Sequence, residues 1–146
     1  MNNISKKSFN IVLDTLIHLI ISLEISIIVY IRFGNIFYVF LAILGGILID
    51  IDHTVDYFVH YKKISLKSLI YFPYQKKKRV YLFFHSWELV ILLSLIAFSL
   101  QSKPLQIFCF AWGLHLLVDN LDDFKEKGFF YYFLFYRLSK EFKVVG

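Results

Sequence analysis

Acidic and histidine side chains follow directly after an apolar segment near the middle of the sequence. They are Asp50, Asp52, His53, Asp56 and His60. If this stretch is helical, a rotation of about 100° per residue places four of them within an arc of about 120°, with Asp52 beside that arc. Carboxylates and imidazoles converging on one face are ligands that divalent metals such as zinc prefer. Metal binding is therefore the chemistry that this stretch predicts.

Histidine and carboxylate residues also occur as pairs in three other apolar segments. The pairs are Asp14 with His18, His85 with Glu88, and His115 with Asp119. Three or four positions separate the two members of each pair, so both lie on one face of a helix. Such pairs build metal sites inside helical bundles, although a single pair is often only a carboxylate that orients a histidine. Three pairs together with the central cluster favour one shared metal site.

The elements that must bring these residues together are apolar segments long enough to cross a bilayer. The chain has 146 residues, of which 58% are apolar and 20% aromatic, more than a soluble domain of this size needs. We predict one domain, an all-α integral membrane bundle of four transmembrane helices with a C-terminal interfacial helix. The spans cover about residues 9–31, 36–53, 80–100 and 105–120, and the interfacial tail covers 128–143. The second helix either ends near residue 53 or continues to residue 60.

The basic residues set the expected orientation. Of the 16 lysine and arginine residues, only Arg32 and Lys103 lie in the two short turns. The positive-inside rule therefore places both termini in the cytoplasm, and the acid and histidine groups of all four helices then lie at the cytoplasmic side. Because this topology explains the net charge of +5, we expect membrane lipids as partners and no nucleic acid. The basic run 76–79 has two interpretations, contact with anionic lipid or attraction of a phosphate-bearing substrate.

Two further residues limit the chemistry. Cys109 is the only cysteine, which excludes a metal site built from several thiolates. Arg137, in the aromatic tail, suits either the membrane interface or a phosphate clamp. The predicted site is therefore made of oxygen and imidazole ligands.

Three motifs carry a resemblance to a known family. They are Asp50-Ile51-Asp52-His53, then His85-Ser86, then the element from Gly113 through His115 to Asp119, and His18 matches a histidine near the N-terminus. In order and spacing, over about residues 14–120, they resemble the YdjM-type membrane-bound, metal-dependent hydrolases, also described as LexA-binding, inner-membrane-associated hydrolases. That family is distantly similar to zinc-dependent phospholipases C and single-strand nucleases, which hold zinc with His-x-x-x-Asp helices. The resemblance implies a metal-dependent phosphoester hydrolase in a bacterial inner membrane.

The chain departs from the family pattern at two places. Ile49 stands where the family has proline, and the segment 81–84 replaces an Arg-Gly-x-Thr sequence before His85. If that arginine and threonine position the substrate, the resemblance supports metal binding more strongly than it supports catalysis.

The combined prediction is a divalent metal site at the cytoplasmic membrane face. The expected ligands are His18, Asp50, Asp52, His53, His85, His115 and Asp119. We expect zinc, as one or two ions, with Mn²⁺ or Mg²⁺ as alternatives. The metal would activate a water molecule and polarise a phosphoryl oxygen, with Glu88 or Asp56 as the catalytic base. A lipid or lipid-linked phosphoester suits a site at this depth.

The competing interpretation is a membrane protein that binds a metal without catalysis, in a regulatory or structural role, or that transports metal ions or protons. A transporter should carry ionisable residues near the bilayer midplane along a path to both faces. The outward half of the predicted bundle has almost none apart from Glu24. The pattern therefore favours a site on one side over a conduit.

Overall fold

The computed structural model describes residues 3–61 and 79–143, and the regular elements among these residues are all helical. The basic residues 76–78 and the side chain of Asp14 lie outside the described part of the chain. The predicted all-α class is confirmed.

The first two helices form an antiparallel hairpin. Helix α1 (Asn3–Phe33) is joined to α2 (Ile36–Ile47) by Gly34, which has φ +61, and by Asn35. Asn35 caps α2, because its Oδ1 accepts a hydrogen bond of 2.9 Å from the N–H of Phe37. A single 3-10 turn, η1 (Leu48–Asp50), carries the chain from α2 into α3 (Ile51–His60). The apolar helix therefore continues to His60.

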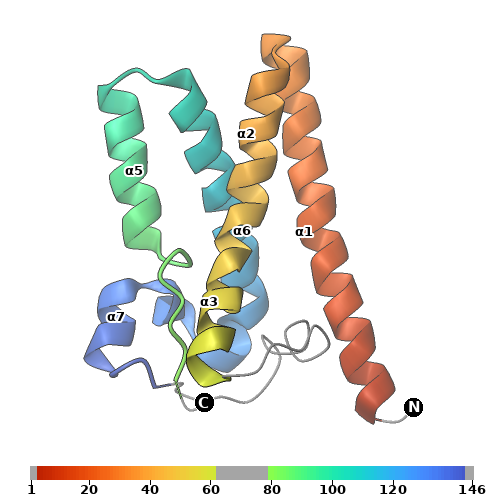
Figure 1. Ribbon diagram of the computed structural model, residues 1–146, viewed down its shortest axis with the longest axis vertical. Coiled ribbons are helices and arrows are strands. Elements are labelled where there is room, and N and C mark those ends of the chain that lie inside the picture. The colour runs from red at the N-terminus through yellow and green to blue at the C-terminus, as the bar shows by residue number, and fades with distance from the viewer. Residues whose placement is uncertain (1–2, 62–78, 144–146) are drawn as a thin grey trace.

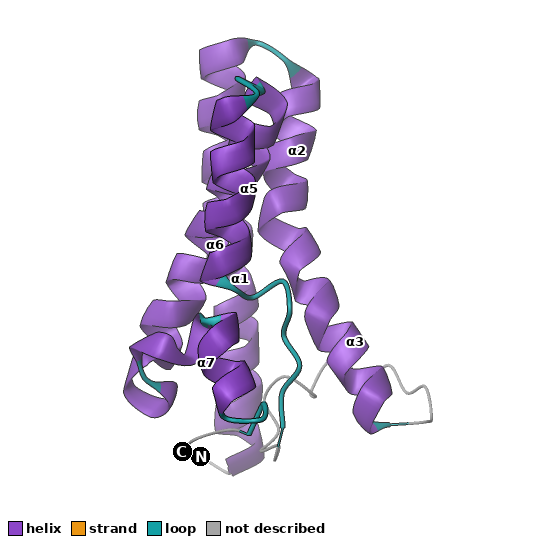
Figure 2. Ribbon diagram, turned by 90° about the vertical axis from the view of Figure 1, so that its left-hand side faces the viewer, coloured by secondary structure: helices purple, strands orange, loops and turns teal. Residues whose placement is uncertain are grey.

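A second hairpin consists of α5 (Trp87–Ser99) and α6 (Lys103–Lys127). The predicted span 80–100 is wrong at its start, because α5 begins only at Trp87. Ser86 has extended backbone angles and its Oγ accepts a 3.3 Å hydrogen bond from the N–H of Leu89, so it caps the helix at this point. Residues 80–86 lead up to α5 as a non-helical segment (Figure 2). In the other direction, α6 continues seven residues beyond the predicted end at residue 120.

The two hairpins pack through α2 and α6. Helix α2 lies between α1 and α6, while α5 packs on another side of α6 (Figure 1). Gly45 permits the close approach of α2 to α6, because a Cβ atom at this position would lie 2.5 Å from the backbone oxygen of Phe108. Two apolar clusters fill the interior. One contains Ile25, Val29, Ala42, Ile107 and Ala111, and the other Ile49, Val90, Trp112, Leu116, Tyr131 and Tyr132.

The C-terminal segment differs from the predicted interfacial helix. It forms two short helices, η2 (Phe129–Tyr132) and α7 (Leu134–Ser139). Three of its polar or aromatic side chains, Tyr131, Tyr132 and Arg137, are buried. The segment packs below the start of α5, near the end of the molecule that holds both chain ends (Figure 1).

Two helical segments are long and apolar enough to cross a membrane, Leu16–Phe33 and Ile36–His60. Helix α5 is apolar but has only 13 residues. Among the described residues, two candidate spans are therefore present where the sequence predicts four. Large apolar side chains are nevertheless exposed on α1, α2, α5 and α6, for example Ile28, Ile31, Ile36, Leu95, Phe98 and Phe110.

Candidate metal centre

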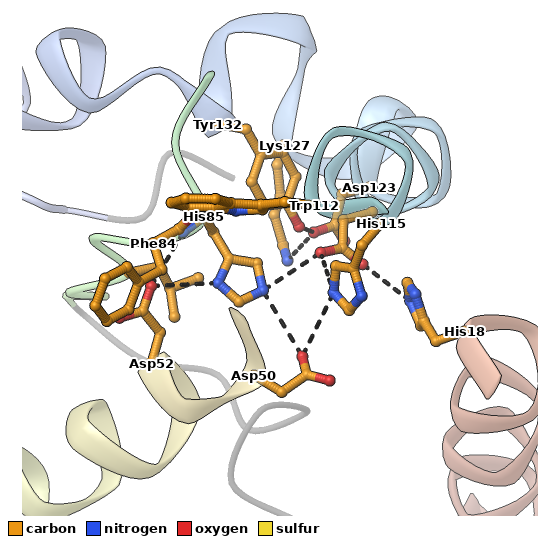
Figure 3. Close-up of polar contacts among 12 residues, drawn as sticks. His18, Asp50, Asp52, Phe84, His85, Trp112, His115, Asp123, Lys127 and Tyr132 are labelled. Carbon is orange, nitrogen blue, oxygen red and sulfur yellow. Dashed lines mark hydrogen bonds and ion pairs between the residues drawn. The ribbon is translucent and has the colours of Figure 1, made fainter. Parts of the chain in front are cut away.

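Histidine and aspartate side chains from four parts of the chain meet inside the bundle (Figure 3). They form two groups, within each of which the potential ligand atoms lie within 4.8 Å of one another. One group is His18, His115 and Asp119, and the other is Asp50, His53 and His85. These are six of the seven ligands predicted from the sequence, and each group could hold a metal ion.

The two groups adjoin through a ring of four atoms. Asp119 Oδ2 lies 3.4 Å from His85 Nε2 and 3.3 Å from His115 Nε2. Asp50 Oδ1 lies 3.8 Å from His85 Nε2 and 3.5 Å from His115 Nε2. A tetrahedral zinc site with bonds of about 2.0–2.1 Å has edges of about 3.3–3.4 Å between its ligand atoms. Three of the four contacts are close to these edges, and the contact of Asp50 with His85, at 3.8 Å, is longer.

Three atoms of this ring are buried and make no hydrogen bond to any described residue. They are His85 Nε2, His115 Nε2 and Asp119 Oδ2. A buried polar atom without a hydrogen bond is costly, and unless a proton lies between them, two nitrogens and two oxygens that face one another place their lone pairs in opposition. A cation at the centre of the ring would satisfy all four atoms.

Both carboxylate oxygens of Asp119 contact histidine nitrogens. Its second oxygen, Oδ1, lies 3.0 Å from His18 Nε2. The His18 ring also stacks on that of His115, with 4.2 Å between centroids and an angle of 27°. One carboxylate is thus shared by three histidines from α1, α6 and the segment before α5, so Asp119 is the central residue of the site.

Asp52 is predicted as a ligand but belongs to neither group. Its Oδ2 instead accepts a 3.0 Å hydrogen bond from the backbone N–H of His85 and lies 3.3 Å from His85 Nδ1. A carboxylate at Nδ1 favours the tautomer that carries the proton there, which leaves the lone pair of Nε2 for the ring. In this structure Asp52 therefore orients His85, a candidate ligand.

Replacing Asp52 with asparagine should weaken metal binding by about 10–100-fold, the usual effect of losing a carboxylate that orients a ligand histidine. Competition with a chromophoric chelator would measure this change. Asp56→Asn is the matched control. Asp56 is also a buried carboxylate on α3, and its Oδ1 accepts a 3.1 Å bond from the N–H of Tyr81 in the same segment. Equal losses in both variants would contradict the role of Asp52.

The two predicted bases bind backbone groups. Glu88 accepts hydrogen bonds from the N–H of Leu134 at 2.8 Å and of Phe135 at 3.0 Å, so it caps the start of α7. Asp56 is fully buried, and His60 Nδ1 lies 2.8 Å from its backbone oxygen. The catalytic role of either carboxylate stays a prediction.

Side chains that sequence reasoning did not assign to the site hold the segment that carries His85. The indole N–H of Trp112 donates a 3.0 Å hydrogen bond to the backbone oxygen of Phe84. Arg137 donates to the backbone oxygens of Leu82 and His85, and it is buried at 2% exposure. Burial lowers the pKa of Arg137. Arg137 therefore points into the protein, where neither of its predicted roles, contact with the membrane interface or clamping of a phosphate, is seen, and the sequence carries no signal for these contacts.

A further polar cluster adjoins the histidines. The phenol of Tyr132 donates to Asp123 Oδ2 at 2.5 Å, and Lys127 pairs with the same oxygen at 2.5 Å. The Tyr132 ring lies 6.2 Å from that of His85. Burial and the carboxylates of Asp119 and Asp123 raise the pKa of Tyr132, so it stays a neutral donor. The spacing of Asp119 and Asp123 on α6 is the one sequence signal that could have indicated this cluster.

No protein-family model, curated protein or solved structure matches the chain. The class of protein is therefore defined by the fold and the site alone. Over residues 3–61 and 79–143, the chain is helical, with two candidate membrane-spanning segments and two adjoining His/Asp groups that could hold metal.

Proposed function

We propose that the chain is a membrane-embedded, metal-dependent hydrolase that acts on phosphoesters. The observation that carries this proposal is the ring formed by Asp50, His85, His115 and Asp119, in which three buried atoms make no hydrogen bond to the described residues. Each of these four residues comes from a region that the sequence predicts to supply ligands.

Zinc fits this donor set best. Two imidazole nitrogens and two carboxylate oxygens, 3.3–3.8 Å apart around the ring, suit Zn²⁺, whereas Mg²⁺ prefers six oxygen ligands. One ion would use the four-atom ring. With two ions, His18 and His53 would complete the two groups. Asp119 would serve both ions, because its Oδ1 contacts His18 of the first group and its Oδ2 contacts His85 of the second as well as His115. Mn²⁺ remains the second candidate.

The exposure of the ring favours catalysis over a purely structural site. The side chains of His85 and His115 are 1% and 2% exposed, but that of Asp50 is 50% exposed. Catalytic metal sites keep one position for water, while structural ones are closed by four protein ligands, so an ion held by the whole ring would take its water as a fifth ligand or in place of the exposed Asp50. A divalent ion supplies a water of lowered pKa and polarises a phosphoryl oxygen. Water and substrate would reach the site past Asp50.

The resemblance to the YdjM-type hydrolases supports the same reaction class. Its motifs supply Asp50, His53, His85, His115 and Asp119, all members of the two groups. Because the chain departs from the family pattern at Ile49 and at residues 81–84, the resemblance does not specify which phosphoester is the substrate.

The proposed location is a bacterial inner membrane, with several spans and both termini in the cytoplasm. Two apolar helices of sufficient length and the apolar side chains exposed on the bundle support it. In this setting the site lies where α2 passes into α3, inside the second candidate span, and His18 lies near the start of the first. A lipid or lipid-linked phosphoester would reach it from the membrane.

Removal of the metal should abolish hydrolysis, and zinc should restore it. The test uses protein purified in nanodiscs with a panel of phosphomonoesters, phosphodiesters and phospholipids, before and after chelation and after addition of zinc or manganese. His115→Ala, which removes one atom of the ring, should be inactive under all conditions. Stoichiometric metal without turnover on any substrate would favour a metal-binding protein in a regulatory or structural role.

A further inference from the structure

The guanidinium of Arg137 is directed at the backbone of the segment that precedes α5. It donates one hydrogen bond to the oxygen of Leu82 and another, of 2.7 Å, to the oxygen of His85. Arg137 is 2% exposed and its Nε makes no hydrogen bond to the described residues. A buried cation normally pairs with a carboxylate, so its use on two backbone carbonyls calls for an explanation.

His85 is the ligand that most needs such support. It precedes the cap of α5 and therefore has no helical hydrogen bonds of its own to fix its backbone. Asp52 accepts from its N–H, and Arg137 donates to its carbonyl. Its peptide groups are thus held from both sides, which directs the ring toward Asp50 and Asp119.

The C-terminal segment is attached to this region at two further points. Glu88, in the first turn of α5, accepts both N–H bonds from the start of α7. At the other end, Val80 donates a 3.0 Å hydrogen bond to the backbone oxygen of Phe142. These contacts hold Arg137 in register with residues 82–85.

We propose that residues 128–143 complete the metal centre, with Arg137 as the positioning residue for His85. The inference rests on the proposed metal site. It explains why a buried arginine next to the histidines donates to backbone oxygens and does not pair with a carboxylate of the described residues. It also explains why the predicted interfacial tail folds back onto the bundle. Arg137 touches neither metal nor substrate in this scheme.

The test uses the full chain loaded with Co²⁺, whose visible absorption reports the geometry and number of its ligands. Arg137→Met should lower the Co²⁺ and Zn²⁺ affinities by about 10–100-fold and change the Co²⁺ spectrum. Arg137→Lys, which can donate to one carbonyl, should recover part of both. Arg32→Met is the matched control, because it removes the same charge from an exposed arginine in the last turn of α1; it should leave the spectrum unchanged.

A wild-type spectrum and affinity in folded Arg137→Met would overturn the inference, as would an equal change in the Arg32 control. If Arg137→Met does not fold, Glu88→Gln provides the second variant. It weakens the attachment of α7 and should alter the Co²⁺ spectrum in the same direction by a smaller amount, and an unchanged spectrum would overturn the inference. Wild-type protein that binds no Co²⁺ or Zn²⁺ would instead refute the proposed function.

Discussion

Asp119→Asn is expected to abolish stoichiometric metal binding. The substitution keeps the size of the side chain but removes its negative charge and replaces one oxygen with a donor. Asp119 faces His18, His85 and His115 at 3.0–3.4 Å, so all three lose their common partner. The affinity for zinc should fall by more than about 100-fold, the upper limit for losing a group that only orients a ligand.

Glu126→Gln is the control for this experiment. Glu126 is an exposed residue on the same helix, seven positions further along, and its change removes the same charge. Measuring the zinc affinity of both variants by competition titration separates the loss of a ligand from the general effect of negative charge on metal attraction. A loss of tenfold or less in Asp119→Asn, or a similar loss in the control, would contradict the central place of Asp119.

Gly45→Ala should destabilise the fold and loosen the metal centre. The added Cβ would meet the backbone oxygen of Phe108 at 2.5 Å and the Cβ of Ala111 at 3.1 Å. A backbone oxygen cannot rotate away, so α2 and α6 must separate, at a cost of about 1–3 kcal/mol of unfolding free energy. Because Asp50 follows Gly45 on the same helical segment, the 3.5 Å contact between Asp50 and His115 should lengthen and zinc affinity should also fall.

Gly113→Ala is the matched control, and its effect on stability should have the opposite sign to that of Gly45→Ala. Gly113 is inside α6, and a Cβ there would meet only Val90 Cγ1 at 3.4 Å, an ordinary contact. Alanine is favoured over glycine in a helix by about 0.8–1 kcal/mol, so this variant should be as stable as the wild type or more stable. Unfolding in a titration with sodium dodecyl sulfate, followed by circular dichroism, measures both. Equal stability of Gly45→Ala and the wild type would contradict the close contact of α2 with α6.

The sequence predicts the convergence of the site because its ionisable residues are costly in apolar helices and therefore informative. His18, Asp50, His53, His85, His115 and Asp119 all come together in the two groups. Helical spacing accounts for His115 with Asp119 on α6 and for Asp50 with His53 where η1 passes into α3, whereas packing between segments brings His18 and His85 to them. The all-α class follows from apolar segments long enough to form membrane-spanning helices.

The parts that the sequence does not predict depend on contacts between distant segments. An apolar run predicts a helix from residue 80, but Asp52, Trp112 and Arg137 bind the backbone of residues 82–85 and hold it outside α5. Likewise, sequence spacing alone cannot distinguish a carboxylate that is a candidate metal ligand from one that orients a ligand histidine. Asp52 and Asp50 are two positions apart, yet only Asp50 faces the ring.

Glu88 illustrates the same limit. Its spacing of three from His85 indicates a shared helix face, but His85 lies before the helix begins. The carboxylate therefore turns to the N–H groups of α7. A pair rule based on helical geometry holds only where both residues are in the helix.

X-ray absorption at the zinc edge of the purified, zinc-loaded protein tests the central claim most directly. The expected result is stoichiometric zinc with four nitrogen and oxygen neighbours at about 2.0–2.1 Å, the outer-shell scattering of at least two imidazoles, and no sulfur at about 2.3 Å. Zinc below one ion per chain, or a zinc environment without imidazole, would contradict the proposed metal centre.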